Sequence, residues 1–281
     1  MRVDVHGEGG TAGVANEDLA GVVVPAGGLG GAVVVLDGVT PPRDGVTGCV
    51  HDVPWFTARL GGALQELLAA RAGSLREALA DAVARTAAAH GPGCDLGHVR
   101  TPQATVAMAR WDDDRVEYLV LSDAALLVEG ADGEVSPVLD RRLDQLPDRI
   151  RKQRAAVRAL PEGSPEREAA GREYARAVEA LRNADGGFYT AAADPRVAAK
   201  AVAGVLPRSE VTAFAALTDG ATRYTEVFRL GDWAELLAVL RKEGPAQLIA
   251  RVRAAENADP DRTAHPRGKT HDDATAVYVE L

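Results

Sequence analysis

Three apolar, strand-like segments of the sequence each have an aspartate at the C-terminal end. The three segments are VVVLDG (33–38), YLVLSD (118–123) and AALTDG (215–220). A fourth motif, HDDAT (271–275), places aspartates just before the last strand-like segment, and NED (16–18) precedes the first one. Antiparallel neighbours bring the end of one strand beside the start of the next. We therefore expect Asp37, Asp219 and Asp272 to meet at one edge of a sheet, with the NED segment beside them.

Carboxylates that converge on a half-buried edge repel one another, so they must raise their pKa values or bind a cation. Carboxylate and backbone carbonyl oxygens suit hard ions such as Mg²⁺ or Mn²⁺. The two cysteines, Cys49 and Cys94, show no CxxC spacing, so neither a zinc ribbon nor a disulfide framework is expected. No His or Cys cluster is expected to compete for a softer metal. One Asp-Gly after a strand is a common turn, but four such motifs in order are far more specific.

The elements that must position these aspartates follow from periodicity and turn chemistry. Strands are expected at 21–25, 32–36, 105–110, 116–121, 124–129, 135–139, 211–217 and 274–281. Helices are expected at 59–71, at 74–90, from Asp194-Pro195 to about Gly204, after Asp232, and at 245–258. Ser74 with Glu77, and Asp232 with Glu235, are placed as helix caps. Because strands cluster at the start, middle and end, and Asp132-Gly133 is typical of a hairpin turn, we expect an α+β fold with antiparallel sheets.

A glycine cluster between the first two strands needs a separate interpretation. Its members are Gly27, Gly28, Gly30 and Gly31. It could be taken for a phosphate cradle, but it lacks the Lys-Ser/Thr of a P-loop and a strand follows it. We interpret it as a hairpin turn.

Residues 140–183 differ in kind from the rest of the chain. The segment is rich in Arg, Glu and Ala, and Pro161 to Pro165 interrupts it. Ser164 and Pro165 suit the N-cap and first position of a helix. We expect a charged helical hairpin, or flap, inserted into a single domain that spans 1–281; a partly disordered linker is the alternative.

Composition narrows the function classes. The chain has 281 residues, a net charge of -9 and 46% hydrophobic residues, enough for a sizeable core. The acidic balance argues against nucleic-acid and anionic membrane partners. The polar N-terminus is not typical of a signal peptide, and no apolar run suits a membrane span, so we expect a cytoplasmic protein. Oligomeric state is left open.

Five motifs follow one another along the chain: NED, a strand ending in DG, a Gly-Asp-Ser-like strand end, TDG and DDAT. Their order resembles that of PP2C (PPM) protein phosphatases of bacterial type. The resemblance runs from about Asn16 to Leu281. It implies a four-layer αββα sandwich of two antiparallel sheets flanked by helices. It also implies metal-dependent hydrolysis of phosphoserine and phosphothreonine in a phosphorylated protein substrate, with water activated by two or three Mn²⁺ or Mg²⁺ ions.

The same resemblance assigns roles to residues. Asp37 would bridge both metals, and Asp37, Asp219 and Asp272 would be the catalytic carboxylates. The implied metal ligands are Glu17, Asp18, Asp37, Gly38 (through its carbonyl), Asp123, Asp219 and Asp272. Asp123 would serve a third, weaker metal, although Ala124 stands where the family has serine. Asp273 stands where many members have asparagine.

Two departures from the family pattern affect substrate binding and proton transfer. Gly13 occupies the place of the arginine that clamps phosphate, and an Arg fork is hard to replace. Its possible substitutes are Arg43, Arg100 and Arg223. The general-acid histidine after Asp-Gly is also missing, and its possible substitutes are His51 and His271. Cys49 with His51 would suggest a cysteine nucleophile, but no third orienting group is evident.

Three functions remain open from the sequence. The leading hypothesis is an active phosphoprotein phosphatase, because every core metal carboxylate is retained. The second is a weak or inactive pseudophosphatase that binds a partner, with 140–183 as the contact surface. The third keeps the metals but acts on a small phosphoester. The substrate protein itself cannot be named from the sequence.

Overall fold

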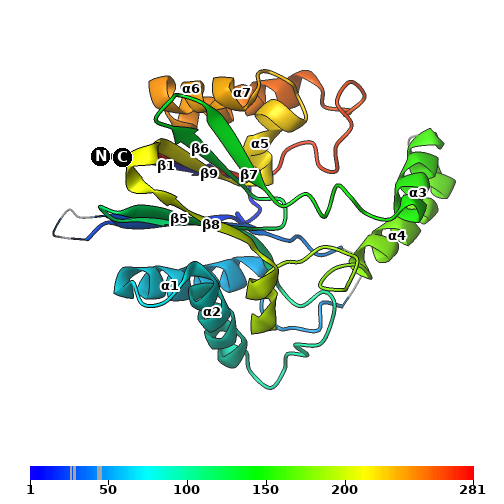
Figure 1. Ribbon diagram of the computed structural model, residues 1–281. Coiled ribbons are helices and arrows are strands. Elements are labelled where there is room, and N and C mark those ends of the chain that lie inside the picture. The colour runs from blue at the N-terminus through cyan, green and yellow to red at the C-terminus, as the bar shows by residue number, and fades with distance from the viewer. Residues whose placement is uncertain (26, 28–29, 43–45, 162) are drawn as a thin grey trace.

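The structure is a computed structural model that describes residues 1–25, 27, 30–42, 46–161 and 163–281. Its described residues form a sandwich of two five-stranded antiparallel sheets with helices on both outer faces (Figure 1). The strands are β1 (Arg2–Glu8), β2 (Leu19–Val23), β3 (Gly31–Gly38), β4 (Ala104–Trp111), β5 (Arg115–Leu121), β6 (Ala125–Gly130), β7 (Val135–Leu139), β8 (Val202–Pro207), β9 (Val211–Leu217) and β10 (Ala274–Glu280).

One sheet has the order β1-β10-β9-β6-β7 and the other the order β2-β3-β4-β5-β8. Consecutive strands form the hairpin pairs β2–β3, β4–β5 and β6–β7. The first and last strands pair with each other, from Arg2 opposite Glu280 to Glu8 opposite Ala274. The four-layer αββα sandwich expected from the sequence is confirmed.

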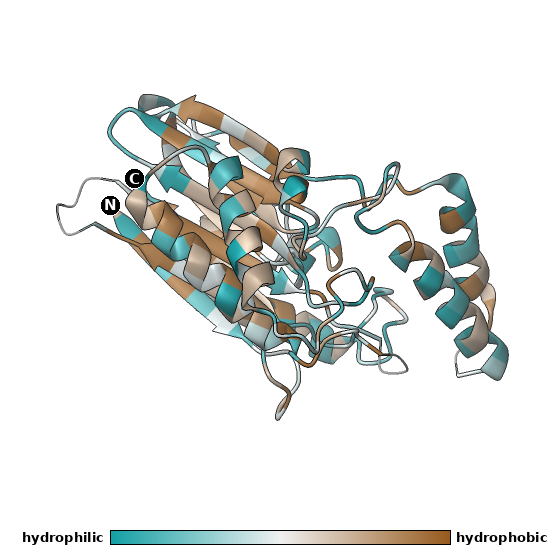
Figure 2. Cartoon of the chain, turned by 90° about the horizontal axis from the view of Figure 1, so that it is seen from below, coloured by the Kyte–Doolittle hydropathy of each residue, from teal (hydrophilic) through white to brown (hydrophobic). Residues whose placement is uncertain are grey.

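The helices form the two outer layers and one projecting hairpin. They are α1 (Val53–Ala70), α2 (Leu75–Ala89), α3 (Asp148–Ala159), α4 (Pro165–Glu179), α5 (Asp219–Glu226), α6 (Trp233–Glu243) and α7 (Pro245–Ala258). Helices α1 and α2 pack on the β2–β8 sheet, and α5, α6 and α7 pack on the other. Both views show α3 and α4 standing away from the sandwich (Figures 1 and 2), and the colouring of Figure 2 shows that hydrophobic residues concentrate in the strands. In the part of the chain described here, no helix combines the length and apolarity needed to cross a membrane.

Strand β3 shows how the core is divided between layers. Successive side chains of a strand point to opposite faces. Val34 and Leu36 pack with the buried leucines of α1 and α2, while Val33 and Val35 pack between the sheets against residues such as Phe214 of β9. A strand buried on both faces must be apolar at every position, which explains the uninterrupted AVVVL run.

Helix caps agree well with the sequence. Ser74 and Glu77 form the predicted capping box of α2, and Asp232 and Glu235 form that of α6. Helix α1 begins at Val53, six residues before the predicted start at 59, because the Asp52 side chain accepts a hydrogen bond from the Trp55 backbone N–H at 2.9 Å. Pro54 sits in the first turn of that helix, where proline is tolerated.

The 140–183 segment contains the predicted helical hairpin. Ser164 caps α4 by accepting from the Arg167 backbone N–H, with Pro165 as the first helical residue. Its base is anchored by a small apolar group of Leu146, Ile150, Leu181 and Phe188. The remaining helical residues are mostly exposed and charged.

Two expectations differ from the structure. The helix predicted from Asp194-Pro195 to Gly204 is wrong: a 3₁₀ turn (Pro195–Lys200) ends early, and the chain continues as edge strand β8, paired with β5. Strand β1 was not expected, because its RVDVHGE sequence is half polar and exposed; it is fixed by pairing with β10. Strands β2 and β3, the first two that the sequence predicted, do form the expected hairpin, although Gly28 lies outside the described residues.

Candidate active site

The predicted aspartates converge at one end of the sandwich, between the two sheets. Asp37 lies near the end of β3 in one sheet, while Asp219 follows β9 and Asp272 precedes β10 in the other. The Asp219 backbone N–H faces Asp37 Oδ2 at 3.4 Å. The prediction that they share one sheet edge is wrong, because the cluster needs strands from both sheets.

The cluster stores strong electrostatic repulsion. Burial, together with the nearby Asp272 and Asp123 carboxylates, raises the pKa of Asp219 to about 8. Burial and then the charge of Asp219 raise the pKa of Asp37 well above its usual range. Burial raises the pKa of Asp18 to about 7. Acidic groups held in this way gain when a cation replaces their protons.

Asp18 is positioned by Thr218. The Thr218 hydroxyl donates to Asp18 Oδ2 at 2.9 Å and accepts from the Thr275 backbone N–H at 2.9 Å. The other oxygen, Asp18 Oδ1, is buried without a hydrogen-bond partner. A buried carboxylate oxygen without a donor is costly in a protein interior and fits a cation ligand.

Glu17 and Gly38 lie against each other at the start of the site. The Thr40 hydroxyl donates to Glu17 Oε2, and burial raises the pKa of Glu17. A Cβ atom on Gly38 would come within 2.3 Å of Val53 Cγ1 and 2.7 Å of the Glu17 carbonyl oxygen. Only glycine fits there, because the backbone of the NED segment passes directly over it.

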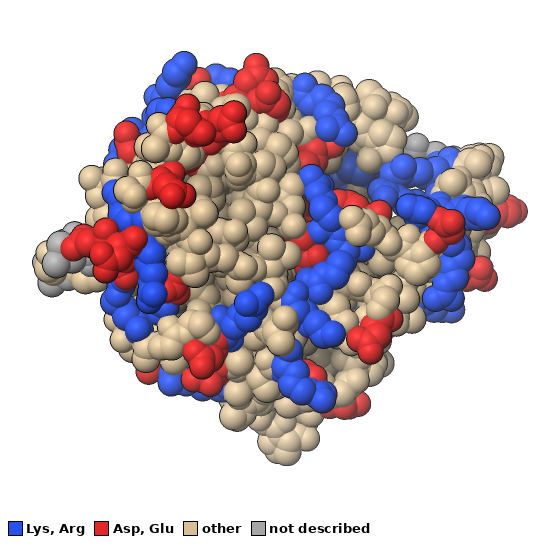
Figure 3. Space-filling view, viewed as in Figure 1, with Lys and Arg blue, Asp and Glu red and all other residues tan. Residues whose placement is uncertain are grey.

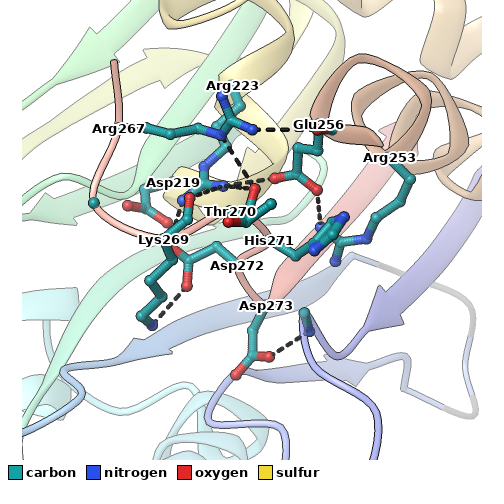
Figure 4. A network of polar contacts seen from close by, with 12 residues as sticks. Asp219, Arg223, Arg253, Glu256, Arg267, Lys269, Thr270, His271, Asp272 and Asp273 are labelled. Atoms are coloured by element: carbon teal, nitrogen blue, oxygen red, sulfur yellow. Dashed lines mark hydrogen bonds and ion pairs between the residues drawn. The ribbon is translucent and has the colours of Figure 1, made fainter. Parts of the chain in front are cut away.

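Asp273 holds the NED segment in place. Its two carboxylate oxygens accept from the backbone N–H groups of Gly10 and Glu17, at 2.8 and 2.7 Å. Asp273 therefore anchors the backbone that carries Glu17 and Asp18. Figure 4 shows this side chain turned away from Asp272.

Asp272 is the centre of a charge network (Figure 4). Arg223 donates to Asp272 Oδ2 at 2.6 Å and to Glu256 Oε1 at 2.6 Å. Lys269 Nζ donates to Asp272 Oδ1 at 2.7 Å and to the Thr40 hydroxyl at 2.8 Å. Although burial lowers the pKa of Lys269, the charge of Asp272 and its hydrogen bond raise it overall, so the lysine stays charged.

Asp123 lies in the tight connection between β5 and β6. Ser122 before it adopts a positive φ of 67°, and its backbone N–H donates to Asp140 Oδ2 at 3.0 Å. Arg142 holds Asp140 with two further hydrogen bonds. Burial, with repulsion from Glu226 and Asp144, raises the pKa of Asp123 to about 6. Burial thus leaves Asp123 needing a positive partner.

Two of the three arginines predicted to replace the missing phosphate clamp, Arg100 and Arg223, are paired with carboxylates. Arg223 is buried between Glu256 and Asp272, and Arg100 forms a bidentate pair with Glu179 at the end of α4, at 2.9 and 3.0 Å. Arg43 lies outside the described residues. Gly13 has open space around it. Lys269, which the sequence did not single out, is a second cation on Asp272, beside Arg223.

The two histidines predicted as general acids lie in different surroundings. His271 Nε2 is 2.8 Å from Asn257 Oδ1. His51 lies with Cys49, His90 and Cys94, whose ligand atoms are all within 4.8 Å of one another. The expectation of no His or Cys cluster is therefore wrong: helices α1 and α2 separate the two halves of this group in sequence, and the fold brings them together.

A cavity of about 610 Å³ opens between the carboxylates and the α3–α4 hairpin. Its lining includes Asp123, Asp219, Asp272, Lys269, Ile150, Arg151, Arg154 and Tyr174. Figure 3 shows Lys and Arg atoms gathered between the sandwich and the hairpin, with acidic atoms among them. The cavity therefore combines carboxylates, which could bind metal ions, with cationic side chains.

Three of the solved structures that share this fold are bacterial serine/threonine phosphatases. Staphylococcus aureus serine/threonine phosphatase Stp1 superposes with a TM-score of 0.57 at 13% identity, covering 99% of this chain and 94% of that one. Mycobacterium tuberculosis serine/threonine phosphatase PstP/Ppp has a TM-score of 0.54 at 16% identity, covering 100% and 98%. The catalytic domain of PstP in complex with two manganese ions has a TM-score of 0.54 at 16% identity, covering 99% and 97%.

At these identities the likeness shows the fold alone. No curated protein sequence is significantly similar to the chain. The family model for protein phosphatase 2C, however, matches residues 11–253, which is most of the sequence. This match includes the NED, Asp37-Gly38, Asp123 and Asp219-Gly220 motifs. The chain belongs to the protein phosphatase 2C family.

Proposed function

We propose that this protein is an active, metal-dependent serine/threonine protein phosphatase. The observation that carries the proposal is the convergence of Asp18, Asp37 and Asp219 with pKa values raised by burial and mutual repulsion. Such a cluster is costly to maintain without cations and suited to binding them. Its hard oxygen donors fit Mn²⁺ or Mg²⁺.

The ligand assignment follows the family order. Asp37 would lie between two ions, with the Gly38 carbonyl and Glu17 on one side and Asp219 and Asp272 on the other. Asp18 would support the first side, and its Oδ1 atom, which has no hydrogen-bond partner, is suited to that role. Asp123 would serve a third ion. The manganese pair in the PstP catalytic domain supports Mn²⁺ as the first ion to test. When bound, such ions would supply charge to bind a phosphate ester and activate water.

The chain's own residues supply the rest of the phosphate site. Lys269 is held at the cluster by Thr40 and Asp272, so its ammonium group can contact a phosphate oxygen next to the carboxylates. A lysine offers a point charge where the family arginine offers a planar fork. We therefore expect weaker phosphate binding than in enzymes with the arginine, rather than none.

The α3–α4 hairpin is proposed to govern substrate choice. Arg151 and Arg154 of α3 line the cavity together with Asp219 and Asp272. Charged residues beside a phosphate site select the residues that flank the phosphorylated one. Replacing 151–177 by a short Gly-Ser linker keeps buried Ile150 and Glu179. We expect this variant to bind Mn²⁺ normally and to change its ranking of phosphopeptides; loss of Mn²⁺ binding in a folded variant would contradict this role.

The test of the function is p-nitrophenyl phosphate hydrolysis with and without Mn²⁺, for the natural chain and Asp219→Asn. Metal-dependent turnover that the substitution abolishes supports the proposal. A panel of phosphoserine and phosphothreonine peptides against small phosphoesters then separates a protein phosphatase from an enzyme of small substrates.

A second candidate is a pseudophosphatase. It is favoured by the pairing of Arg100 and Arg223 with carboxylates, together with Gly13 at the clamp position. In this case Mn²⁺ would bind, as measured by calorimetry, but neither p-nitrophenyl phosphate nor phosphopeptides would be hydrolysed. The same assay therefore decides between the two functions.

A further inference from the structure

Four metal-ligating side chains from three separate segments meet outside the carboxylate cluster. They are Cys49 and His51 in the loop before α1, His90 at the end of α2, and Cys94 in the next loop. Cys49 Sγ lies 3.5 Å from His51 Nδ1, 3.3 Å from His90 Nδ1 and 2.9 Å from Cys94 Sγ. Cys94 Sγ lies 3.4 Å from His51 Nδ1. One ligand atom from each residue thus faces a common centre.

These separations fit a tetrahedral zinc ion. With Zn–S near 2.3 Å and Zn–N near 2.0 Å, a tetrahedron places S and N about 3.5 Å apart and two sulfurs about 3.8 Å apart. The three S–N distances already match. The S–S distance is longer than a disulfide bond of about 2.05 Å, and the sulfurs would separate by about 0.9 Å around an ion.

We propose that Cys49, His51, His90 and Cys94 form a structural zinc site. Two thiolates and two imidazoles are a soft donor set that selects zinc over the Mn²⁺ or Mg²⁺ suited to the carboxylates. Four protein ligands fill a tetrahedral shell, so the site leaves no open position for substrate and serves structure. The spacing Cys-x-His followed by His-x₃-Cys supplies two ligands from each side of the α1–α2 pair.

The surroundings orient the ligands. The His51 ring stacks on Trp55 of α1 at 3.7 Å between centroids, and the His90 ring meets the same indole edge-on at 4.8 Å. The His51 backbone N–H points to Cys49 Sγ at 3.4 Å, as a thiolate ligand requires. Packing of this kind fixes both rings in place before a metal binds.

The site would fasten the loop that leaves the candidate active site. This loop begins after Gly38, carries Thr40 against Glu17 and Lys269, and reaches Cys49 before entering α1. Its second anchor is the Asp95 backbone N–H, which donates to the Gly48 carbonyl oxygen at 2.6 Å. Zinc would tie the loop to the C-terminal end of α2, so its removal is expected to lower the melting temperature.

The test measures metal directly and needs no enzyme activity. The full chain, purified under reducing conditions and passed through a desalting column, is assayed for zinc by elemental mass spectrometry. We expect stoichiometric zinc in the natural chain, in Asp37→Asn/Asp219→Asn and in His6→Gln, a histidine control on β1. We expect its loss in Cys49→Ser and Cys94→Ser.

Cobalt substitution gives a readout on the natural chain, which is independent of whether the cysteine variants fold. Co²⁺ bound by two thiolates shows an intense thiolate-to-cobalt charge-transfer band and the visible bands of tetrahedral Co²⁺. Cobalt binding without the charge-transfer band would overturn the proposal. So would zinc retained by a folded Cys49→Ser variant, or a Cys49–Cys94 disulfide found by peptide mapping in a zinc-free chain.

Discussion

Replacing Asp219 by asparagine should remove a pH-dependent cost from the metal-free protein. The pKa of Asp219 is raised from 3.8 to about 8 by burial and by its carboxylate neighbours. Between these two values the unfolded chain carries the charge, while the folded chain keeps the proton. Folding stability conferred by protonated Asp219 is therefore fully present below pH 4 and is lost as pH rises toward 8.

The magnitude follows from the width of this window. Each pH unit within it changes the free energy of unfolding by about 1.36 kcal/mol. From pH 5 to pH 7 the natural chain should thus lose about 2–3 kcal/mol relative to Asp219→Asn, which cannot ionise there. The two curves should converge near pH 4.

The assay is urea denaturation in EDTA at pH 4, 5, 6 and 7. Asp81→Asn, on the exposed face of α2, is the matched control and should follow the natural chain at every pH. Added Mn²⁺ should reverse the ranking at pH 7, because a ligand that binds only the folded state stabilises it. Equal pH dependence of the natural chain and Asp219→Asn would refute the claim that the cluster holds protons against repulsion.

Three further substitutions test how the site is built. Arg223→Ala should cost about 1.5–3 kcal/mol, because it removes the cation that buried Glu256 and Asp272 share and leaves them paired with Arg253 and Lys269. Exposed Arg196→Ala should change stability little, and equal effects of the two substitutions would contradict a buried network. Gly38→Ala should cost about 1–3 kcal/mol, since the added Cβ would lie 2.3 Å from Val53 Cγ1. Its control, Gly62→Ala, lies in open space on α1 and should stabilise the protein by about 0.5–1 kcal/mol. Urea denaturation measures both changes. Thr218→Val should cost about 1–3 kcal/mol, because Asp18 loses the hydrogen bond from the Thr218 hydroxyl. The same loss raises the pKa of Asp18 further, so Mn²⁺ binding measured by calorimetry at pH 7 should weaken. Unchanged binding would contradict this reasoning.

The sequence predicted elements well where a pattern is local. The AVVVL run of β3 and the capping boxes at Ser74 and Asp232 each have a cause within a few residues. Strand β1 escaped prediction because its half-polar sequence is stabilised by pairing with the far end of the chain. Helix α5 was not predicted either, because Asp-Gly after a strand is typical of a turn, whereas Asp219-Gly220 is the start of this helix.

The candidate site was predicted in its parts and not in its assembly. The order of motifs selected the converging aspartates, but whether strands share a sheet depends on long-range pairing, so the single-edge arrangement was wrong. Arg223 was predicted as a possible phosphate ligand, but it pairs with Glu256, which lies 33 residues later in the sequence. Local sequence gives no sign of this long-range ion pair. Cys49 and His90 are 41 residues apart, and only the packing of α1 on α2 brings them together.

The central claim is that the converged carboxylates form a working metal-dependent phosphatase site. It is tested most directly by phosphate release from a phosphothreonine peptide across a Mn²⁺ titration, for the natural chain and Asp37→Asn. We predict turnover that rises with Mn²⁺ and is lost in Asp37→Asn while the variant stays folded. Turnover that is independent of Mn²⁺, or equal in the two proteins, would contradict the account.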